Sequence, residues 1–479
     1  HGHHEQSMAL SGIGYARAMR RKQIFIATSS SGPGAMNMVT AAGVALSNRL
    51  PLLLLPGDVF ASRFPDPVLQ QVENFNSPSV TQNDSFKAVS KYFDRITRPE
   101  QILSSLPQAI QMMLDPSECG PATISMSQDV QGEAFDYPEI FFEEKIHHIR
   151  KIYPDPSQIE QAAEQLKKST QPIIIAGGGV LYAEAEKELS DFAKKHNIPV
   201  TATVMGIGCM DKEDPYYISA IGCLGDGSSN NLSKDTDLAL AVGTKLSDFT
   251  TGSWTNFQNA DFNLLSINTS RYDTTKHRAT PVVSDAKIGL QELSKKLGDW
   301  KAPENWYERS QEEKNKWDSY IEKASGPTNQ ETPSYAHAVG AVYRKADKSD
   351  IVVTAAGGLV GETVQIWKPK QKNTFETEWG FSCMGYEISG ALGIKMAKPD
   401  QDVIVFVGDG SYLLHNSDIY SSVIYDKKLI IVVCDNGGHM VINRLQLAKG
   451  GKEYLCNLRA ANASQLQFVD FEAHAKSMG

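Results

Sequence analysis

Two apolar runs, each followed by a short polar motif, constrain the fold of this chain more than any other feature. The run 402–407 leads into Gly408-Asp409-Gly410-Ser411, and the run 429–434 leads into Asp435-Asn436. The stretch between the runs is long enough for one crossover helix, so the runs are predicted to be neighbouring parallel strands. Asp409 and Asn436, 27 residues apart, would then meet at the carboxyl edge of a sheet, where α/β proteins bind ligands.

The residue types at this edge indicate a metal bound together with phosphate groups. The carboxylate of Asp409 and the side-chain carbonyl of Asn436 are hard oxygen ligands suited to Mg²⁺. Gly410 and Ser411 open the helix after the strand, and their backbone N–H groups can bind the same phosphates. A plain Asp-Gly turn is the alternative, but strand context, spacing and partner together favour the metal site.

A second motif, Gly225-Asp226-Gly227-Ser228, has a similar sequence and a weaker context. Its preceding apolar run, 218–222, is short, and Ser253 stands 27 residues after Asp226. No strand ending in Asn follows this motif, so we interpret it as a loop.

Bulk composition is that of a globular protein with several domains. The chain has 479 residues, 41% hydrophobic and 22% charged, and a net charge of -9, which argues against nucleic acid or an anionic membrane as the main partner. The six cysteines have no Cys-x-x-Cys spacing, which indicates reduced thiols and a cytoplasmic protein. No apolar run approaches the length that spans a membrane.

The chain starts at His1 without Met and ends inside a helical pattern, so we expect a longer protein, truncated at both ends.

Alternating strands and helices predict an α/β fold with three parallel-sheet domains. The predicted ranges are 1–150, 155–300 and 334–479, with a charged linker bearing Pro and Gly at 301–333. The strands expected in the first domain are 23–27, 51–56 and 122–126; those expected in the second are 172–176 and 238–242. Gly177-Gly178-Gly179 follows one of these strands, and tight strand-to-helix packing is favoured there over a dinucleotide site.

The motif around Asp409 resembles the metal-diphosphate motif of thiamine diphosphate (ThDP) enzymes. The order of His4-Glu5-Gln6, residues 32–37 (GPGAMN) and residues 51–57 (PLLLLPG) continues this resemblance. It implies a pyrimidine-binding first domain, a central Rossmann-like domain and a diphosphate-binding third domain. The cofactor would be ThDP with Mg²⁺, and the metal ligands would be Asp409, Asn436 and the backbone carbonyl of Gly438.

By this resemblance Glu5 is the catalytic residue. It would hydrogen-bond the pyrimidine N1′ and favour the imino tautomer, whose exocyclic nitrogen removes the C2 proton of the thiazolium. Gly34 and Asn37 would also bind the cofactor. Met384, 25 residues before Asp409, stands where the family carries the bulky side chain that keeps the cofactor folded. Gly408, Gly410 and Ser411 complete the cofactor-binding set. The family also places the Glu-bearing domain of one subunit against the metal-bearing domain of another, which implies a homodimer or homotetramer.

The central domain resembles that of acetohydroxyacid synthases, which bind FAD there. Those synthases carry arginines at the positions of Lys245 and Phe249. Lysine lacks the bidentate guanidinium fork and phenylalanine lacks the charge, so these two positions argue against FAD.

A closer resemblance lies with the ThDP hydrolases of myo-inositol catabolism, which open the ring of 3D-(3,5/4)-trihydroxycyclohexane-1,2-dione to give 5-deoxy-glucuronate. The segments that carry it span nearly the whole chain: 65–71, 94–101, 127–130, 380–393 and 453–456. The implied reaction is C–C cleavage between two adjacent carbonyls, with addition of water. The substrate would be a small neutral polyol diketone, and Asn83, His415 and His439 are candidates for binding its hydroxyls, each with a structural role as the alternative.

Two other functions remain open from the sequence. The first is an acetohydroxyacid synthase or 2-oxo acid decarboxylase acting on pyruvate-like substrates, against which Lys245 and Phe249 weigh. The second is a non-catalytic homologue that binds the cofactor, against which the retained Glu5, Asp409 and Asn436 weigh. Turnover of pyruvate would favour the first, and cofactor binding without turnover would favour the second.

Overall fold

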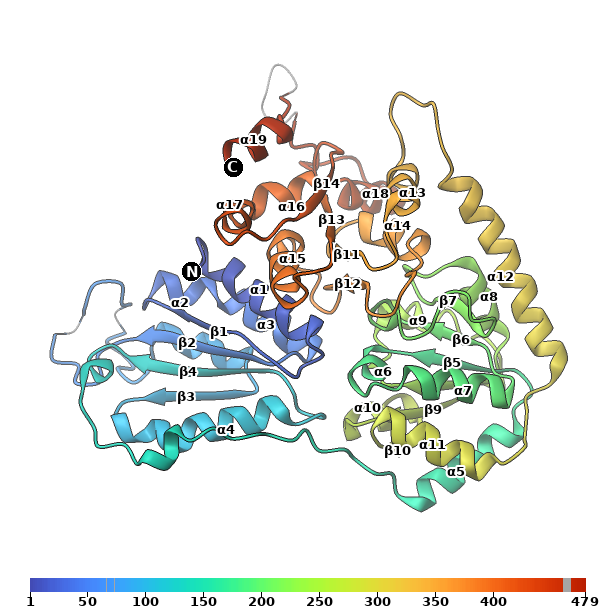
Figure 1. The fold of residues 1–479 in the computed structure, drawn as a ribbon, viewed down its shortest axis with the longest axis horizontal. Helices are drawn as coiled ribbons and strands as arrows, with labels where there is room; N and C mark the ends of the chain where they lie inside the picture. The colour runs from blue at the N-terminus through green and yellow to red at the C-terminus, as the bar shows by residue number, and fades with distance from the viewer. Residues whose placement is uncertain (66, 73, 460–466) are drawn as a thin grey trace. The chain divides into compact units, whose positions relative to one another are not determined.

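The computed structural model describes residues 1–65, 67–72, 74–459 and 467–479, and Figure 1 shows its ribbon. The chain divides into two compact units. The first unit contains residues 1–150, 355–357 and 378–479, and the second contains residues 151–354 and 358–377. Asp66, which belongs to the segment 65–71 used for the family resemblance, lies outside the described residues.

The N-terminal part of the first unit is a parallel sheet with strand order β1-β2-β4-β3. Its strands are β1 (Ile26–Ser29), β2 (Leu52–Asp58), β3 (Tyr92–Ile96) and β4 (Pro121–Ser127). Strands β2 and β4 confirm the predicted strands 51–56 and 122–126, whereas β1 begins three residues later than the predicted strand 23–27. The fourth, β3, was not predicted, because Asp94 and Arg95 interrupt its apolar pattern. Leu53, Ile96 and Ile124 form part of the core against this sheet.

The first unit contains helices near this sheet and further helices in its C-terminal part. The α-helices near the sheet are α1 (Glu5–Ala18), α2 (Pro33–Asn37), α3 (Val39–Asn48) and α4 (Ile102–Leu114). Short 3₁₀ helices span Gln82–Ala88, Pro99–Gln101, Val130–Gly132 and Glu139–Phe142. The C-terminal α-helices are α15 (Tyr386–Ala397), α16 (Asp409–Leu414), α17 (Ser417–Ile424), α18 (Met440–Ala448) and α19 (Phe471–Ser477).

The two apolar runs that opened the sequence analysis form strands β13 (Val403–Gly408) and β14 (Ile430–Cys434). They pair in parallel, with Gly408 opposite Cys434, as predicted. Two short helices, α16 and α17, connect them instead of the single crossover helix that was expected, because the chain leaves the helical conformation at His415 and Asn416. Asp409 and Asp435, one residue beyond the paired Gly408 and Cys434, therefore follow neighbouring strand ends.

Helices α1 and α15 pack against each other at backbone distance within the first unit (Figure 1). A Cβ atom on Gly14 would lie 2.2 Å from the carbonyl oxygen of Gly390, and one on Gly393 would lie 1.8 Å from that of Ser11. The Ser11 hydroxyl also donates a hydrogen bond to the Ser389 carbonyl, at 2.7 Å. Glycine at these positions is therefore what lets the helix carrying Glu5 dock on the helix that follows Met384.

The second unit is built on a six-stranded parallel sheet with the order β10-β9-β8-β5-β6-β7. The strands are β5 (Pro172–Ala176), β6 (Val200–Ala202), β7 (Tyr217–Ala220), β8 (Leu238–Val242), β9 (Asn263–Asn268) and β10 (Thr280–Val283). Strands β5 and β8 have the predicted bounds. A further parallel pair in this unit is β11 (Ile351–Thr354) with β12 (Phe375–Thr377).

Helices cover both faces of the six-stranded sheet, whose buried residues form two clusters that include Ile174 and Leu240 in one and Ile173 and Ala241 in the other. The helices of this unit are α5 (Pro156–Lys168), α6 (Gly178–Tyr182), α7 (Glu186–His196), α8 (Gly227–Asp235), α9 (Asp248–Thr251), α10 (Arg271–Thr275), α11 (Ala286–Leu297), α12 (Glu304–Ala324), α13 (Tyr335–Lys345) and α14 (Leu359–Ile366). Its 3₁₀ helices span Val204–Gly206 and Lys276–Arg278. The α/β class with parallel sheets is confirmed.

Two segments of this unit differ from the sequence-based interpretation. The segment 301–333, expected to be a linker, contains the 21-residue helix α12, whose Trp306 is buried and donates to the Pro172 carbonyl. The motif at Asp226, interpreted as a loop, begins helix α8 instead. Asp226 is its N-cap and accepts the Ser229 N–H at 3.0 Å. Among the described residues, no helix combines the length and the hydropathy needed to span a membrane.

Candidate active site

The structure places Asp409 and Asn436 together at the carboxyl edge of β13 and β14. The Asn436 backbone N–H donates to Asp409 Oδ1 at 3.4 Å. The Gly438 N–H donates to Asn436 Oδ1 at 3.1 Å, which fixes the Asn436 side chain over the turn that follows. A Cβ atom on Gly438 would lie 2.2 Å from the Cys456 carbonyl oxygen, and Gly438 has a φ of 147°, so glycine is required there.

The charge around Asp409 suits a cation. Burial raises the pKa of the Asp409 carboxyl, the Asn436 N–H lowers it, and the negative charge of Asp435 raises it. Asp435 is itself paired with Arg459. In the part of the chain that the structure describes, no group of three or more His, Cys, Asp or Glu side chains could hold a metal. A metal at Asp409 would therefore need amide, backbone or phosphate oxygens as its other ligands.

Met384 and His439 converge on Gly410 at the start of α16. A Cβ atom on Gly410 would lie 3.4 Å from the Met384 Cε and 3.3 Å from the His439 Cε1. Gly408, in contrast, has no atom of any other described residue, apart from its two chain neighbours, within 4 Å of its Cβ position. The predicted cofactor-binding residues Met384 and Gly410 thus lie close together, although they come from segments that the sequence separates.

Glu5 lies beside Gly34 and Asn37, two residues that the sequence analysis also assigned to cofactor binding. The Asn37 Nδ2 donates to Glu5 Oε2 at 2.9 Å. A Cβ atom on Gly34 would lie 3.1 Å from Glu5 Oε1, so glycine leaves room for that oxygen. Among the described residues, no hydrogen bond occupies Glu5 Oε1. The carboxylate is therefore held through one oxygen and available through the other.

The start of α1 contacts the segments around Met384 and the end of α16. The Ser7 Oγ and His415 Nδ1 are 2.7 Å apart, and the rings of His4 and His415 pack edge to face with centroids 4.8 Å apart. Burial lowers the pKa of His415, and the nearby His4 lowers it further. These contacts bring residues next to Glu5 beside the C-terminal half of the site within one unit.

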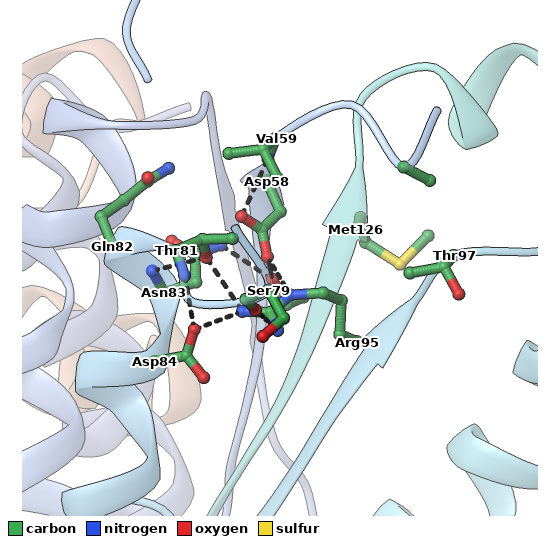
Figure 2. Close-up of polar contacts among 12 residues, drawn as sticks. Asp58, Val59, Ser79, Thr81, Gln82, Asn83, Asp84, Arg95, Thr97 and Met126 are labelled. Atoms are coloured by element: carbon green, nitrogen blue, oxygen red, sulfur yellow. Dashed lines mark hydrogen bonds and ion pairs between the residues drawn. The ribbon is translucent and has the colours of Figure 1, made fainter. Parts of the chain in front are cut away.

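Asn83, a candidate for binding substrate hydroxyls, has a structural role. It is fully buried, and its Nδ2 donates to the Gly57 carbonyl at 2.9 Å and to the Ser125 Oγ at 2.8 Å. Figure 2 shows it beside a polar cluster centred on Arg95 at the carboxyl end of β2. This position makes Asn83 part of the support of the first sheet.

In this Arg95 cluster (Asp58, Thr81, Asp84 and Arg95), one guanidinium joins two carboxylates (Figure 2). The Arg95 Nε lies 2.7 Å from Asp58 Oδ2, and its second terminal nitrogen lies 2.7 Å from Asp84 Oδ2. That nitrogen also donates to Thr81 Oγ1 at 2.9 Å. The cluster links the end of β2 to the 3₁₀ helix that follows it, and the sequence analysis gave no sign of it.

The glycine turn after β5 is packed against the turn after β8. The Gly177 N–H donates to the Val242 carbonyl at 2.8 Å, and the Gly179 N–H donates to the Gly243 carbonyl at 2.9 Å. A Cβ atom on Gly177 would lie 2.4 Å from the Gly243 oxygen. The prediction of tight packing at this turn is confirmed. Phe249, one of the two positions that argue against FAD, is 42% exposed.

Three family descriptions match successive parts of the chain. They are thiamine pyrophosphate enzyme, N-terminal TPP binding domain, at residues 1–77; the central domain, at residues 159–293; and the C-terminal TPP binding domain, at residues 355–479. The chain belongs to the thiamine pyrophosphate (that is, ThDP) enzyme family, and the predicted resemblance is confirmed.

Within this family the chain is similar over its full length to proteins of one name, 3D-(3,5/4)-trihydroxycyclohexane-1,2-dione hydrolase. The relative from Clostridium tetani is 39% identical and covers 100% of this chain and 79% of its own length. The relative from Geobacillus thermodenitrificans is 39% identical, with 96% and 75% covered. The relative from Bacillus anthracis is 37% identical, with 100% and 79% covered.

Proposed function

We propose that this chain is a ThDP-dependent hydrolase that cleaves the C–C bond between the two carbonyls of 3D-(3,5/4)-trihydroxycyclohexane-1,2-dione. The product would be 5-deoxy-glucuronate, in inositol catabolism. The observation that carries this proposal is the similarity over the full chain to hydrolases of that name. The site residues described above are those that the chemistry needs.

The residues present fit ThDP and Mg²⁺. Asp409, Asn436 and the Gly438 carbonyl would hold the metal, and a buried carboxylate next to a second carboxylate is relieved by a cation. Gly408, Gly410 and Ser411 would receive the diphosphate, with Met384 beside them. Glu5, Gly34 and Asn37 would receive the pyrimidine, because Glu5 Oε1 has no partner among the described residues and faces the space that Gly34 leaves.

Bound ThDP supplies a nucleophilic carbon and an electron sink for C–C cleavage beside a carbonyl. The role of Glu5 would be to hold a proton at the pyrimidine N1′ through Oε1, while Asn37 fixes its other oxygen. The overall reaction adds one water across the bond, leaving one carbon as a carboxylate and the other as an aldehyde. A neutral polyol needs neutral hydrogen-bonding groups, and His439 beside Gly410 and His415, whose pKa is lowered by burial, remain candidates for this role.

The remaining predictions are proposals of the same kind. The ranges 1–150, 155–300 and 334–479 would be the three domains. The protein would form a homodimer or homotetramer with sites between subunits and reside in the cytoplasm, and Lys245 and Phe249 argue against FAD. The six free cysteines support the last point.

The experiment that tests this function compares two substrates. The protein, with ThDP and Mg²⁺, is given the diketone and, in parallel, pyruvate. Ring opening without pyruvate turnover is expected, whereas pyruvate turnover without ring opening would move the chain to the synthase or decarboxylase branch. Cofactor binding with neither reaction would favour the non-catalytic homologue.

Two variants test the site assignments directly. Asp409→Ala should abolish Mg²⁺-dependent ThDP binding, and unchanged affinity in a titration would remove Asp409 as a metal ligand.

Glu5→Ala should retain part of the binding but stop exchange of the cofactor C2 proton with solvent. Normal exchange in this variant would refute the role of Glu5.

A further inference from the structure

The segment that carries Met384 is held by two buried carboxylates that no motif predicted. It runs from Glu378 to Gly385, between β12 and α15, without regular secondary structure, so its backbone N–H groups need other partners. The Phe381 and Cys383 N–H groups donate to Glu378 at 2.8 and 2.7 Å. The Gly385 N–H donates to Glu387 at 3.0 Å. The two glutamates thus bracket Met384 from both sides.

Glu378 anchors this segment to helix α3. The Asn48 Nδ2, at the end of α3, donates to Glu378 Oε1 at 2.7 Å. Asn48 Oδ1 accepts the Gly380 N–H at 3.3 Å, and the Ser47 hydroxyl donates to the Gly380 carbonyl at 2.5 Å. The Met384 segment is therefore fixed to the N-terminal domain of the same unit.

Glu387 connects the other end of the segment to two further parts of the chain. Its Oε1 accepts the Ala356 N–H at 3.3 Å, and the Ser411 side chain is close enough to lower the pKa of this carboxyl. Ser411 lies on α16 next to Gly410, and the Met384 side chain lies close to Gly410. Glu387 thus links the backbone on the C-terminal side of Met384 to the helix against which Met384 packs.

Local capping of α15 does not by itself account for Glu387. A glutamate in the first turn of a helix commonly accepts the N–H of the N-cap residue, here Gly385. Such a carboxylate is normally at the surface, whereas Glu378 and Glu387 are each 1% exposed. In the described part of the chain neither forms an ion pair. Burying a carboxylate without a cation is costly, and burial raises the pKa of Glu387 to about 7. Buried charges of this kind gather at functional sites.

We propose that Glu378 and Glu387 are positioning residues that hold Met384 against Gly410, so that the bound cofactor stays folded for proton transfer at C2. This proposal rests on the proposed function, since it requires ThDP at this site. It assigns the two glutamates to orientation of the cofactor rather than to its affinity. Neither contacts the predicted metal ligands in any hydrogen bond described above.

The test uses Glu378→Gln and Glu387→Gln in the full-length chain, with Mg²⁺ and ThDP. Glutamine replaces one acceptor oxygen by an N–H group that faces the backbone N–H donors, so the segment should shift. Small displacements of a reacting group cost up to about 100-fold in rate, so we expect C2 proton exchange to slow about 10- to 100-fold, with ThDP affinity changed by less than about threefold. The matched control is Glu313→Gln, which alters a buried glutamate of α12 that has cationic partners and should leave exchange unchanged.

A double-mutant cycle with Met384→Ala separates positioning from general loss of structure. If the glutamates act through Met384, adding Glu387→Gln to Met384→Ala should slow exchange little further. Independent, multiplying effects of the two changes would overturn the proposal. If Glu378→Gln fails to fold, Asn48→Ala removes one donor to the same carboxylate and should give a smaller decrease in the same direction.

The outcomes distinguish this proposal from the function it rests on. Native exchange rates in both glutamine variants would overturn the positioning role and leave the hydrolase assignment intact. A second outcome is that the glutamine variants slow C2 proton exchange while the native protein does not open the diketone ring. This result would support the positioning role and refute the proposed substrate. Absence of ThDP binding by the native protein would overturn both.

Discussion

Two carboxylate clusters in the first unit stabilise their buried carboxylates in different ways, one with a cation and the other without. In the Arg95 cluster a guanidinium bonds both Asp58 and Asp84. Around Met384, Glu378 and Glu387 accept backbone N–H groups and have no ion-pair partner among the described residues. The pKa values differ accordingly. Burial raises the pKa of Asp84, but hydrogen bonds from Lys87, Thr81 and Arg95 outweigh it and lower the value to about 2, whereas that of Glu387 rises to about 7.

This difference indicates that the Arg95 cluster supports the fold, whereas the two glutamates around Met384 serve the proposed cofactor site. A carboxylate neutralised by arginine stays ionised at any physiological pH and ties strands together. Glu387, which has hydrogen-bond donors but no cation beside it, has a pKa of about 7, and neither glutamate brings a fixed positive charge beside the predicted cofactor site. The comparison can be tested by changing the charge balance of each cluster in turn.

Removing the cation should have the largest effect. Arg95→Met leaves Asp58, which is fully buried, without its partner, and such a change costs about 3–5 kcal/mol of the free energy of unfolding. Urea unfolding measures it. Lys87→Met is the control, because the Lys87 side chain is 56% exposed, so the loss of its pair with Asp84 should cost less than about 1 kcal/mol. Equal losses in both variants would show that the guanidinium does not compensate a buried charge.

The raised pKa of Glu387 should make the free energy of unfolding depend on pH. The pKa of Glu387 rises from 4.5 to about 7 on folding, so the native state binds the proton more tightly. Its contribution to the free energy of unfolding is complete below about pH 4.5 and is lost as the pH rises to about 7; it amounts to about 3 kcal/mol. Glu387→Gln should abolish this slope. The check is unfolding of both proteins at several pH values between 4.5 and 7, and parallel curves would contradict the assignment.

Asp84 should show a smaller effect of opposite sign. Its pKa falls from 3.8 to about 2 on folding, so its contribution is present above about pH 3.8 and is lost as the pH falls toward 2. We expect about 1 kcal/mol, because solvent screens its exposed partner Lys87. Melting temperatures of the native protein and Asp84→Asn should differ at pH 5 and converge toward pH 2. A constant difference across this range would refute the linkage.

The sequence predicted the parts of the site that depend on local pattern. Strands β13 and β14 are uninterrupted apolar runs, so their pairing and the meeting of Asp409 with Asn436 followed from strand geometry. The contact of Asn37 with Glu5 agrees with the resemblance to ThDP enzymes. Helix α12 was missed because its charged sequence lies between Pro- and Gly-bearing ends, and its burial depends on the sheet it covers.

Residues whose partners come from distant segments could not be predicted in this way. Glu378 depends on Asn48 and Glu387 on Ala356, and no spacing rule connects those positions. Asn83 illustrates the converse, since an amide suited to binding hydroxyls is used to support the first sheet. Asp226 shows that a Gly-Asp-Gly-Ser sequence can simply begin a helix.

The glycine seam between α1 and α15 has a consequence for engineering this chain. A library that randomised positions 14, 390 and 393 should return almost only glycine at Gly14 and Gly393, because even alanine would overlap backbone oxygen atoms there. Neighbouring surface positions would accept wide variation. Directed evolution toward new substrates should therefore keep this seam fixed and place its diversity in the side chains around Gly410.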